Sequence, residues 1–285
     1  MTDYAREYDV AAAIPAFMQI LADWGTRGAE ARAQLSADGR GRLDLAYGAS
    51  PDETLDLFLP PSQAKAPPLL VFLHGGFWRR LHKNDFAWLA RPWLDAGVAV
   101  AIVNYGLAPA TPLDEIVAQT RRSLAWLWHA APAHGHDRRR MVVSGHSAGG
   151  QLAAMALATD WPGLDAALPG DMIAAAITLS PLVELAPLRK VPFLQADLHL
   201  TDALVAGCSP IRHAPAHAAP ILAAVGGRES DEFKRQLKLL VEAWPQCHSR
   251  IVPMPDDDHL SICEAFGRAG TPLHAAALAL LTAKR

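Results

Sequence analysis

A serine stands between two glycines in the segment VVSGHSAGG, Val142–Gly150, which continues a short apolar run. The pentapeptide GHSAG, with Ser147 at its centre, fits the pattern G-x-S-x-G, in which a sharp strand-to-helix turn exposes a nucleophilic serine. The alternative is a glycine-rich turn that binds phosphate, but such turns carry G-x-G-x-x-G or a Walker lysine. The segment has neither, so Ser147 is the candidate nucleophile.

A serine nucleophile needs a base, and the position of His259 suits that role. His259 lies in PMPDDDHLSI, on the loop after the last predicted strand, where a histidine completes the chain order of serine, acid and base. A metal site formed by Asp256–Asp258 with His259 is the alternative, but consecutive loop residues do not converge readily on one ion. We therefore expect neither a metal nor an organic cofactor.

The acid that orients the histidine is expected after the penultimate strand, ILAAVGG. The segment GGRESDEF, which overlaps the end of this strand, holds three candidates, Glu229, Asp231 and Glu232. Glu184, which follows an earlier strand, is a more distant alternative. Spacing alone does not choose among these carboxylates, and each could also be an exposed loop charge.

Backbone N–H groups that stabilise a developing oxyanion are expected at two places. Ala148 supplies one N–H group, because it follows the serine at the start of a predicted helix. The segment HGGFW follows the apolar strand LLVFL and supplies the others. Gly76 and Phe77 are the candidate donors there, and Gly75 shapes the turn.

Three aromatic side chains next to these groups are expected to contact the substrate: Phe77, Trp78 and His146. His74 belongs to the same loop, and we expect it to be buried and to orient the loop without a catalytic role.

These residues need elements to position them, and strands and helices alternate after the first part of the chain. Residues 1–40 show helical periodicity, whereas 42–47 and 55–60 alternate with period two and predict an antiparallel hairpin at a sheet edge. The later apolar runs predict parallel strands buried on both faces. Residues 181–219 are dotted with prolines and are expected to form a lid or pocket wall.

The composition of the chain argues against some classes of protein, those that bind nucleic acid or membrane through a basic surface. The chain has 285 residues, is 51% hydrophobic and carries a net charge of −3, so it offers no basic surface for nucleic acid or membrane. Its three cysteines lack C-x-x-C spacing, and its N-terminus lacks the pattern of a secretory signal. These features predict a cytoplasmic protein with one domain, residues 1–285, and a small-molecule substrate. A homodimer is compatible with them.

The motifs HGGFW, GHSAGGQLA, GGRESDEFKRQ and DDDHLSI together resemble the arylformamidase-like branch of the α/β-hydrolases, which includes kynurenine formamidases and relatives of the hormone-sensitive-lipase esterases. The resemblance implies a mostly parallel eight-stranded sheet with helices on both faces and a small lid-like insert. It also places the acid on Glu229, where that branch has aspartate, and leaves Asp231 in reserve.

The predicted function is that of a serine hydrolase that forms an acyl-enzyme. The resemblance implies carboxylesterase activity on short acyl esters, with aryl formamides such as N-formylkynurenine as the most specific candidate. Two alternatives stay open: a ligand-binding homologue without catalysis, and an acyltransferase or C–C hydrolase that uses the same residues.

Overall fold

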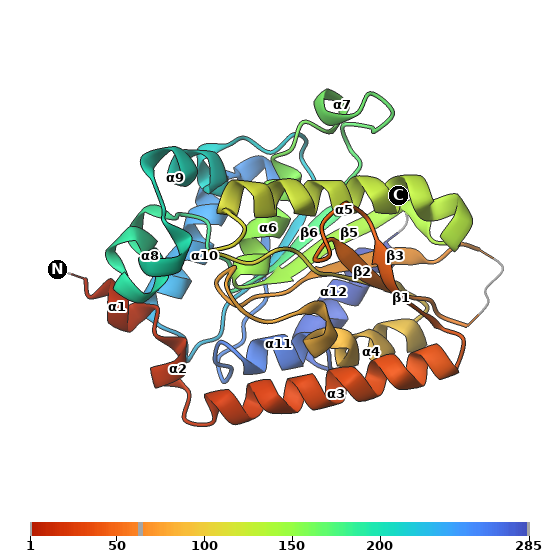
Figure 1. Ribbon diagram of the computed structural model, residues 1–285, viewed down its shortest axis with the longest axis horizontal. Helices are drawn as coiled ribbons and strands as arrows, with labels where there is room; N and C mark the ends of the chain where they lie inside the picture. The colour runs from red at the N-terminus through yellow and green to blue at the C-terminus, as the bar shows by residue number, and fades with distance from the viewer. Residues whose placement is uncertain (1, 62–64, 284–285) are drawn as a thin grey trace.

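The computed structural model describes residues 2–61 and 65–283, and the strands in this part of the chain form one eight-stranded sheet (Figure 1). The strand order is β1-β2-β4-β3-β5-β6-β7-β8, with β1 and β2 antiparallel to their neighbours and all later pairs parallel. The strands are β1 (Gly41–Ala46), β2 (Thr54–Phe58), β3 (Pro68–Leu73), β4 (Ala99–Val103), β5 (Asp137–His146), β6 (Ala175–Leu179), β7 (Ile221–Ala224) and β8 (Arg250–Ile251).

Helices cover both faces of this sheet. Figure 1 shows α5 and α6 on one face and α3, α4, α11 and α12 on the other. The α-helices are α1 (Tyr4–Glu7), α2 (Val10–Ala13), α3 (Phe17–Ala37), α4 (Ala90–Asp95), α5 (Leu113–His134), α6 (Ala148–Leu157), α7 (Trp161–Leu164), α8 (Pro192–Leu198), α9 (Asp202–Cys208), α10 (Asp231–Ala243), α11 (Ser261–Phe266) and α12 (Pro272–Thr282). Short 3-10 helices are η1 (Lys83–Leu89), η2 (Ala186–Lys190), η3 (Pro210–Arg212) and η4 (Pro245–Cys247).

The central strands confirm the predicted parallel sheet. Every residue of β3, β4, β6 and β7 is buried, which is the pattern of strands covered by helices on both faces. The predicted edge hairpin is also confirmed, since β1 and β2 pair in antiparallel fashion and β1 ends the sheet. The sheet therefore places the carboxyl ends of β3, β5, β6 and β7 at one edge, where the loops after them meet.

The connection between β6 and β7 consists largely of short helices, although its sequence predicts irregular chain. Prolines occupy the first turn of η2, α8 and η3. A proline is tolerated there because the first N–H groups of a helix have no partner within the helix. Figure 1 shows α8 and α9 at the same end of the molecule as the N-terminal helices α1 and α2.

Candidate active site

Ser147 lies on the turn between β5 and α6, with backbone angles of φ 57° and ψ −117°. A positive φ costs a residue with a side chain about 1–3 kcal/mol, so the surrounding structure must hold the turn in place. The N–H of Ser147 donates to the carbonyl oxygen of Leu179 on β6 at 2.8 Å. The turn is thus tied to the neighbouring strand, and the serine side chain faces a cavity.

The two glycines of the motif are required by close packing at this turn. A Cβ atom on Gly145 would lie 2.0 Å from the carbonyl oxygen of Gly149, and one on Gly149 would lie 2.0 Å from the carbonyl oxygen of Leu73. No real side chain fits at such distances. The pattern G-x-S-x-G therefore follows from how tightly α6 approaches β3 and β5.

His259 stands on the loop between β8 and α11, and it lines the same cavity as Ser147. Its Nδ1 atom is 2.6 Å from Oε2 of Glu229, and both side chains are buried. Because an ionised carboxylate only accepts hydrogen bonds, Nδ1 carries a proton. In the neutral ring, Nε2 is then unprotonated and is able to accept a proton.

Glu229 is held by two further hydrogen bonds. Its Oε1 atom accepts from Oγ of Ser180 at 2.5 Å and from the N–H of Gly226 at 2.7 Å. Ser180 directly follows β6 and has a φ of 48°. Ser180 was not predicted from the sequence, and its place at the end of a predicted strand is the one signal that pointed to this region.

The other acidic candidates lie elsewhere. The side chain of Asp231, the reserve acid, is 97% exposed and pairs with Lys234 at 3.6 Å. Glu232 is buried, but it accepts hydrogen bonds from Tyr8 and Arg235. Glu184 pairs with the same Arg235. The structure therefore brings Glu229, and none of these three carboxylates, to His259.

The residues predicted to supply the oxyanion donors lie at the cavity or next to Ser147 in the chain. Gly76 and Phe77 line the cavity with it, and Ala148 is the first residue of α6. Gly76 has a φ of 104°, and a Cβ atom there would lie 2.2 Å from the carbonyl oxygen of Arg80. Gly75 lies beneath, since its Cβ would be 3.2 Å from the Cβ of Ser147. The turn therefore needs glycine at position 76, and a side chain at position 75 would crowd the serine.

The cavity beside Ser147 has a volume of about 250 Å³ and a mostly apolar wall. This size lies just below the lower end of the usual range for ligand pockets, roughly 300–1,000 Å³, and favours a small substrate. The side chains of the wall come mainly from the N-terminal segment and from the loop after β3: Tyr8, Asp9, Val10, Ala11, Phe17, Leu21, Trp24, Phe77, Arg79, Arg80 and Leu81.

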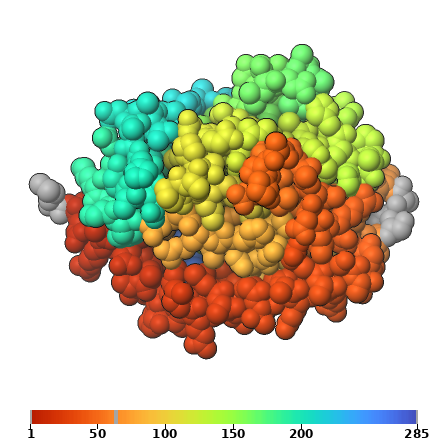
Figure 2. Space-filling view, viewed as in Figure 1, coloured from red at the N-terminus to blue at the C-terminus, as the bar shows by residue number. Residues whose placement is uncertain are grey.

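The insert contributes less to this wall than expected. Of residues 181–219, Phe193 alone is among the lining residues in the described part of the chain. The insert instead packs against the N-terminal segment: the space-filling view shows them next to each other (Figure 2), and Lys190 lies 5.4 Å from the ring centre of Tyr4. The helical segment at the N-terminus therefore forms much of the cavity wall, beside Phe193 of the insert.

Trp78 does not line the cavity, contrary to expectation. It is fully buried, and its indole N–H donates to Oε1 of Gln151 on α6 at 3.0 Å. Phe77 and Trp78 both have positive φ values, so the chain turns sharply between the two side chains. The physical reason for the difference is that the large indole buries its area and satisfies its donor against α6, which leaves Phe77 at the cavity.

Two histidines near the serine, His74 and His146, are buried and held by contacts with neighbouring groups. His74 is stacked on Tyr105 with ring centres 4.2 Å apart, and burial lowers its pKa to about 4. His146 lines the cavity, and its Nε2 atom donates to the carbonyl oxygen of His259 at 2.7 Å. Burial, together with the ring of His259, lowers the pKa of His146 well below its usual range. Both histidines are therefore neutral at pH 7.

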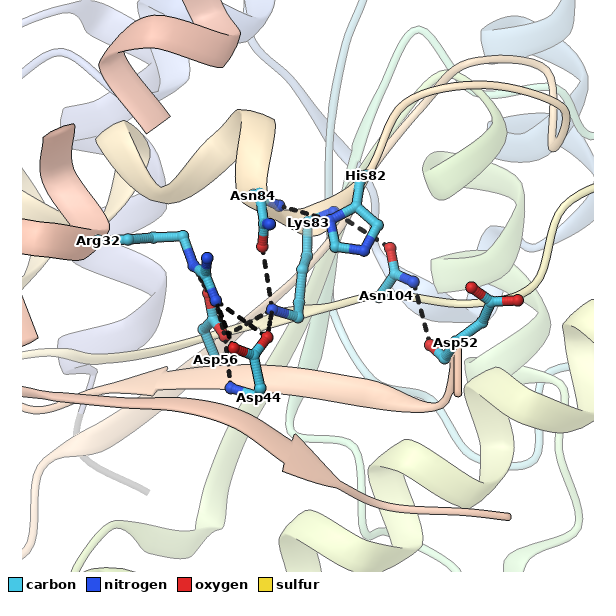
Figure 3. Close-up of polar contacts among 8 residues, drawn as sticks. All are labelled: Arg32, Asp44, Asp52, Asp56, His82, Lys83, Asn84 and Asn104. Carbon is cyan, nitrogen blue, oxygen red and sulfur yellow. Dashed lines mark hydrogen bonds and ion pairs between the residues drawn. The ribbon is translucent and has the colours of Figure 1, made fainter. Parts of the chain in front are cut away.

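A buried ion cluster anchors the far end of the loop that carries the glycines (Figure 3). The ammonium of Lys83, at the start of η1, contacts Oδ1 of Asp56 on β2 at 2.7 Å and also pairs with Asp44 on β1. Arg32 on α3 reaches Oδ2 of Asp56 at 2.7 Å. The cluster thus joins the loop, the edge hairpin and the helix whose first turns line the cavity.

Lys83→Met is expected to lower the free energy of unfolding by about 3 kcal/mol, because it removes a partner from the fully buried carboxylate of Asp56. The control is Lys238→Met, since Lys238 is 74% exposed and its pair with Glu242 contributes under about 1 kcal/mol. Urea unfolding of both variants provides the measurement. An equal loss in the two variants would show that the cluster does not stabilise the fold.

Within the described residues, no group of three or more histidine, cysteine, aspartate or glutamate side chains is arranged to hold a metal ion. Across residues 2–61 and 65–283, no helix combines the length and the apolar character needed to cross a bilayer.

The sheet order, the serine turn at the end of β5 and the histidine loop after β8 define an α/β-hydrolase. A crystal structure of a proposed thioesterase from Silicibacter sp. TM1040 aligns with a TM-score of 0.84 and 28% identity over 99% of this chain and 100% of that one. Esterase B from Lactobacillus rhamnosis shares the fold, with a TM-score of 0.68 and 21% identity over 94% of this chain and 97% of that one.

Comparison with known sequences shows to which family of α/β-hydrolases the chain belongs. The kynurenine formamidase of Danio rerio is 31% identical over 229 residues, which cover 78% of this chain and 75% of the relative. The isoprenylcysteine alpha-carbonyl methylesterase of Arabidopsis thaliana is 29% identical over 41% of this chain and 27% of the relative. The family model BD-FAE matches residues 55–188. The chain belongs to the kynurenine formamidase family, and it is a hydrolase of the esterase and formamidase type.

Proposed function

We propose that this protein is a serine hydrolase that removes a small acyl group from an aryl amine or an alcohol, with aryl formamides such as N-formylkynurenine as its specific substrates. One observation carries the proposal. Ser147, on its strained turn, lines the same cavity as His259, whose Nδ1 is held 2.6 Å from a buried carboxylate. The similarity to the kynurenine formamidases of Danio rerio and Salmo salar supports the choice of substrate.

The proposed reaction proceeds through an acyl-enzyme. Nε2 of His259 takes the proton from Oγ of Ser147 as Oγ bonds to the substrate carbonyl carbon, and the carbonyl oxygen becomes an oxyanion. The N–H groups of Gly76, Phe77 and Ala148 stabilise that oxyanion. The imidazolium then gives its proton to the leaving amine or alcohol as the carbon–nitrogen or carbon–oxygen bond breaks.

Water completes the proposed cycle. His259 removes a proton from a water molecule as the water oxygen attacks the acyl carbon, and the same proton returns to Oγ of Ser147 as the carboxylic acid leaves. Glu229 stabilises the imidazolium in both halves of the reaction, because its Oε2 atom accepts from Nδ1.

The test is the turnover of N-formylkynurenine beside that of p-nitrophenyl acetate by the same preparation. We expect both to be cleaved, with the larger kcat/KM for the formamide. Cleavage of the ester without the formamide would remove the arylformamidase part of the proposal and leave a short-chain esterase. If neither compound is cleaved, the proposed substrate class is wrong.

A further inference from the structure

Two consecutive arginines, Arg79 and Arg80, follow the loop with the glycines, and both line the cavity beside Ser147. The guanidinium of Arg79 is bound by residues of the insert: it pairs with Asp197 on α8 at 2.8 Å and donates to the carbonyl oxygen of Phe193. Arg80 makes no side-chain hydrogen bond or ion pair with any residue that the structure describes. Arg80 is therefore a cavity-lining arginine whose guanidinium has no partner among the described residues.

The other charged or ionisable side chains at the cavity have partners. Oδ1 of Asp9 accepts from the N–H of Ala12 at 3.0 Å and so begins helix α2. The hydroxyl of Tyr8 donates to Glu232, and His259 is bound to Glu229. A hydrogen-bonding ligand that enters the cavity therefore finds its free cationic donors on Arg80.

The environment of Arg80 makes an anion favourable there. The guanidinium is partly desolvated by burial, and Phe77 and Phe193 line the same cavity. Burial, together with the positive charge of Arg79, lowers the pKa of Arg80 from its usual value. Asp197 acts on Arg80 as well, but its carboxylate is already paired with Arg79. A bound carboxylate would replace the lost water with bidentate, charge-assisted hydrogen bonds.

Arg80 also lies close to the reacting centre. Its carbonyl oxygen and its Cγ atom pack against Gly76, where a Cβ atom would lie 2.2 Å and 2.9 Å from them. Its side chain therefore starts next to the proposed oxyanion donors. Ser147 and Arg80 line one cavity of about 250 Å³, so a small substrate bound there lies beside both residues.

We propose that Arg80 is a specificity-determining residue that binds a carboxylate of the substrate, so that the preferred substrates are small acyl compounds with a negatively charged group. This inference rests on the proposed function, because it concerns the same cavity and the same reaction. It narrows the substrate class from aryl amides and esters in general to those that also carry a carboxylate.

The experiment compares two substrates that differ in one charge, 3-acetoxybenzoate and the neutral isostere 3-acetoxybenzamide. The wild-type enzyme is expected to show a kcat/KM about tenfold or more higher for the benzoate, chiefly through a lower KM. Arg80→Gln is expected to remove this preference and bring the ratio to about one. Arg80→Lys should keep part of it, because lysine retains the charge but loses the planar fork.

A matched control removes the positive charge of an arginine that lies outside the cavity. Arg250 is exposed on the edge strand β8, and Arg250→Gln should keep both the turnover and the ratio of the wild type. Benzoate and benzamide, used as competitive inhibitors of p-nitrophenyl acetate hydrolysis, test binding without acyl transfer, and benzoate should be the stronger inhibitor only when Arg80 is present.

The outcomes separate this inference from the proposed function. A wild-type enzyme without preference for the benzoate in either assay, or an Arg80→Gln variant that loses activity on both compounds equally, would overturn the role of Arg80. Failure of the wild type to cleave p-nitrophenyl acetate and both test esters would instead contradict the proposed function.

Discussion

Ser147→Ala is expected to lower kcat by roughly 10³- to 10⁶-fold on any substrate that the enzyme cleaves. Loss of the nucleophile removes the acyl-enzyme route, so that only the oxyanion donors remain to assist the reaction. Folding should be retained. Alanine has the same backbone preferences as serine to a first approximation, and the N–H bond to Leu179 is independent of the side chain. Circular dichroism and urea unfolding would verify this.

The control for this prediction is Ser144→Ala, three residues earlier, on β5. The hydroxyl of Ser144 donates to the carbonyl oxygen of Val71 at 2.8 Å within the sheet, away from the cavity. We expect Ser144→Ala to lower the free energy of unfolding by about 1 kcal/mol and to keep the activity.

A fluorophosphonate probe gives a second measurement on the same variants. It should label the wild type and Ser144→Ala, but not Ser147→Ala, because only an activated serine reacts. Activity that persists in Ser147→Ala would rule out Ser147 as the nucleophile. A wild-type protein that neither reacts with the probe nor cleaves an ester would favour the ligand-binding alternative.

Glu229→Gln is expected to lower kcat by about 10²- to 10⁴-fold. The amide presents no negative charge to the imidazolium, and its NH₂ group favours the tautomer in which Nδ1 accepts and Nε2 carries the proton. That tautomer cannot take the proton of Ser147. KM should change less than kcat, since the carboxylate acts on the developing charge and does not line the cavity.

Asp231→Asn is the matched comparison, two residues further along. Because the side chain of Asp231 is 97% exposed and pairs only loosely with Lys234 within the described chain, we expect its kcat to stay within about twofold of the wild type. Steady-state kinetics on one substrate decide between the two. An equal or larger loss in Asp231→Asn would mean that His259 is oriented by a different carboxylate from the one it contacts here.

Many elements of the fold were predictable because their signals are local. The apolar runs that became β3, β4, β6 and β7 reflect burial on both faces, and the period-two segment that became β1 reflects a strand with one more exposed face. The segment that became β2 also alternates in sequence, but four of its five residues are buried, because Asp56 lies in the ion cluster. The strand–turn–helix around Ser147 was predictable for the same reason, because Gly145 and Gly149 are demanded by sterics within one short segment.

The insert shows where local signals fall short. Its prolines indicate breaks between elements, and they do begin three short helices. They do not indicate what those helices pack against. The N-terminal segment supplies much of the cavity wall beside Phe193 of the insert. Local signals do not reveal this arrangement, because contacts such as the 2.5 Å hydrogen bond from Tyr8 to Glu232 join residues 224 positions apart.

By itself, the sequence determined the class of fold, the serine and its turn, and the histidine after the last strand, because each depends on residue types within a few positions and on chain order. The tertiary structure decided which carboxylate meets His259, which of Phe77 and Trp78 faces the cavity, and that Arg80 is left without a partner among the described residues while Arg79 is paired. These choices depend on the packing of segments far apart in the chain, where neighbours compete for the same hydrogen bonds and the same buried space.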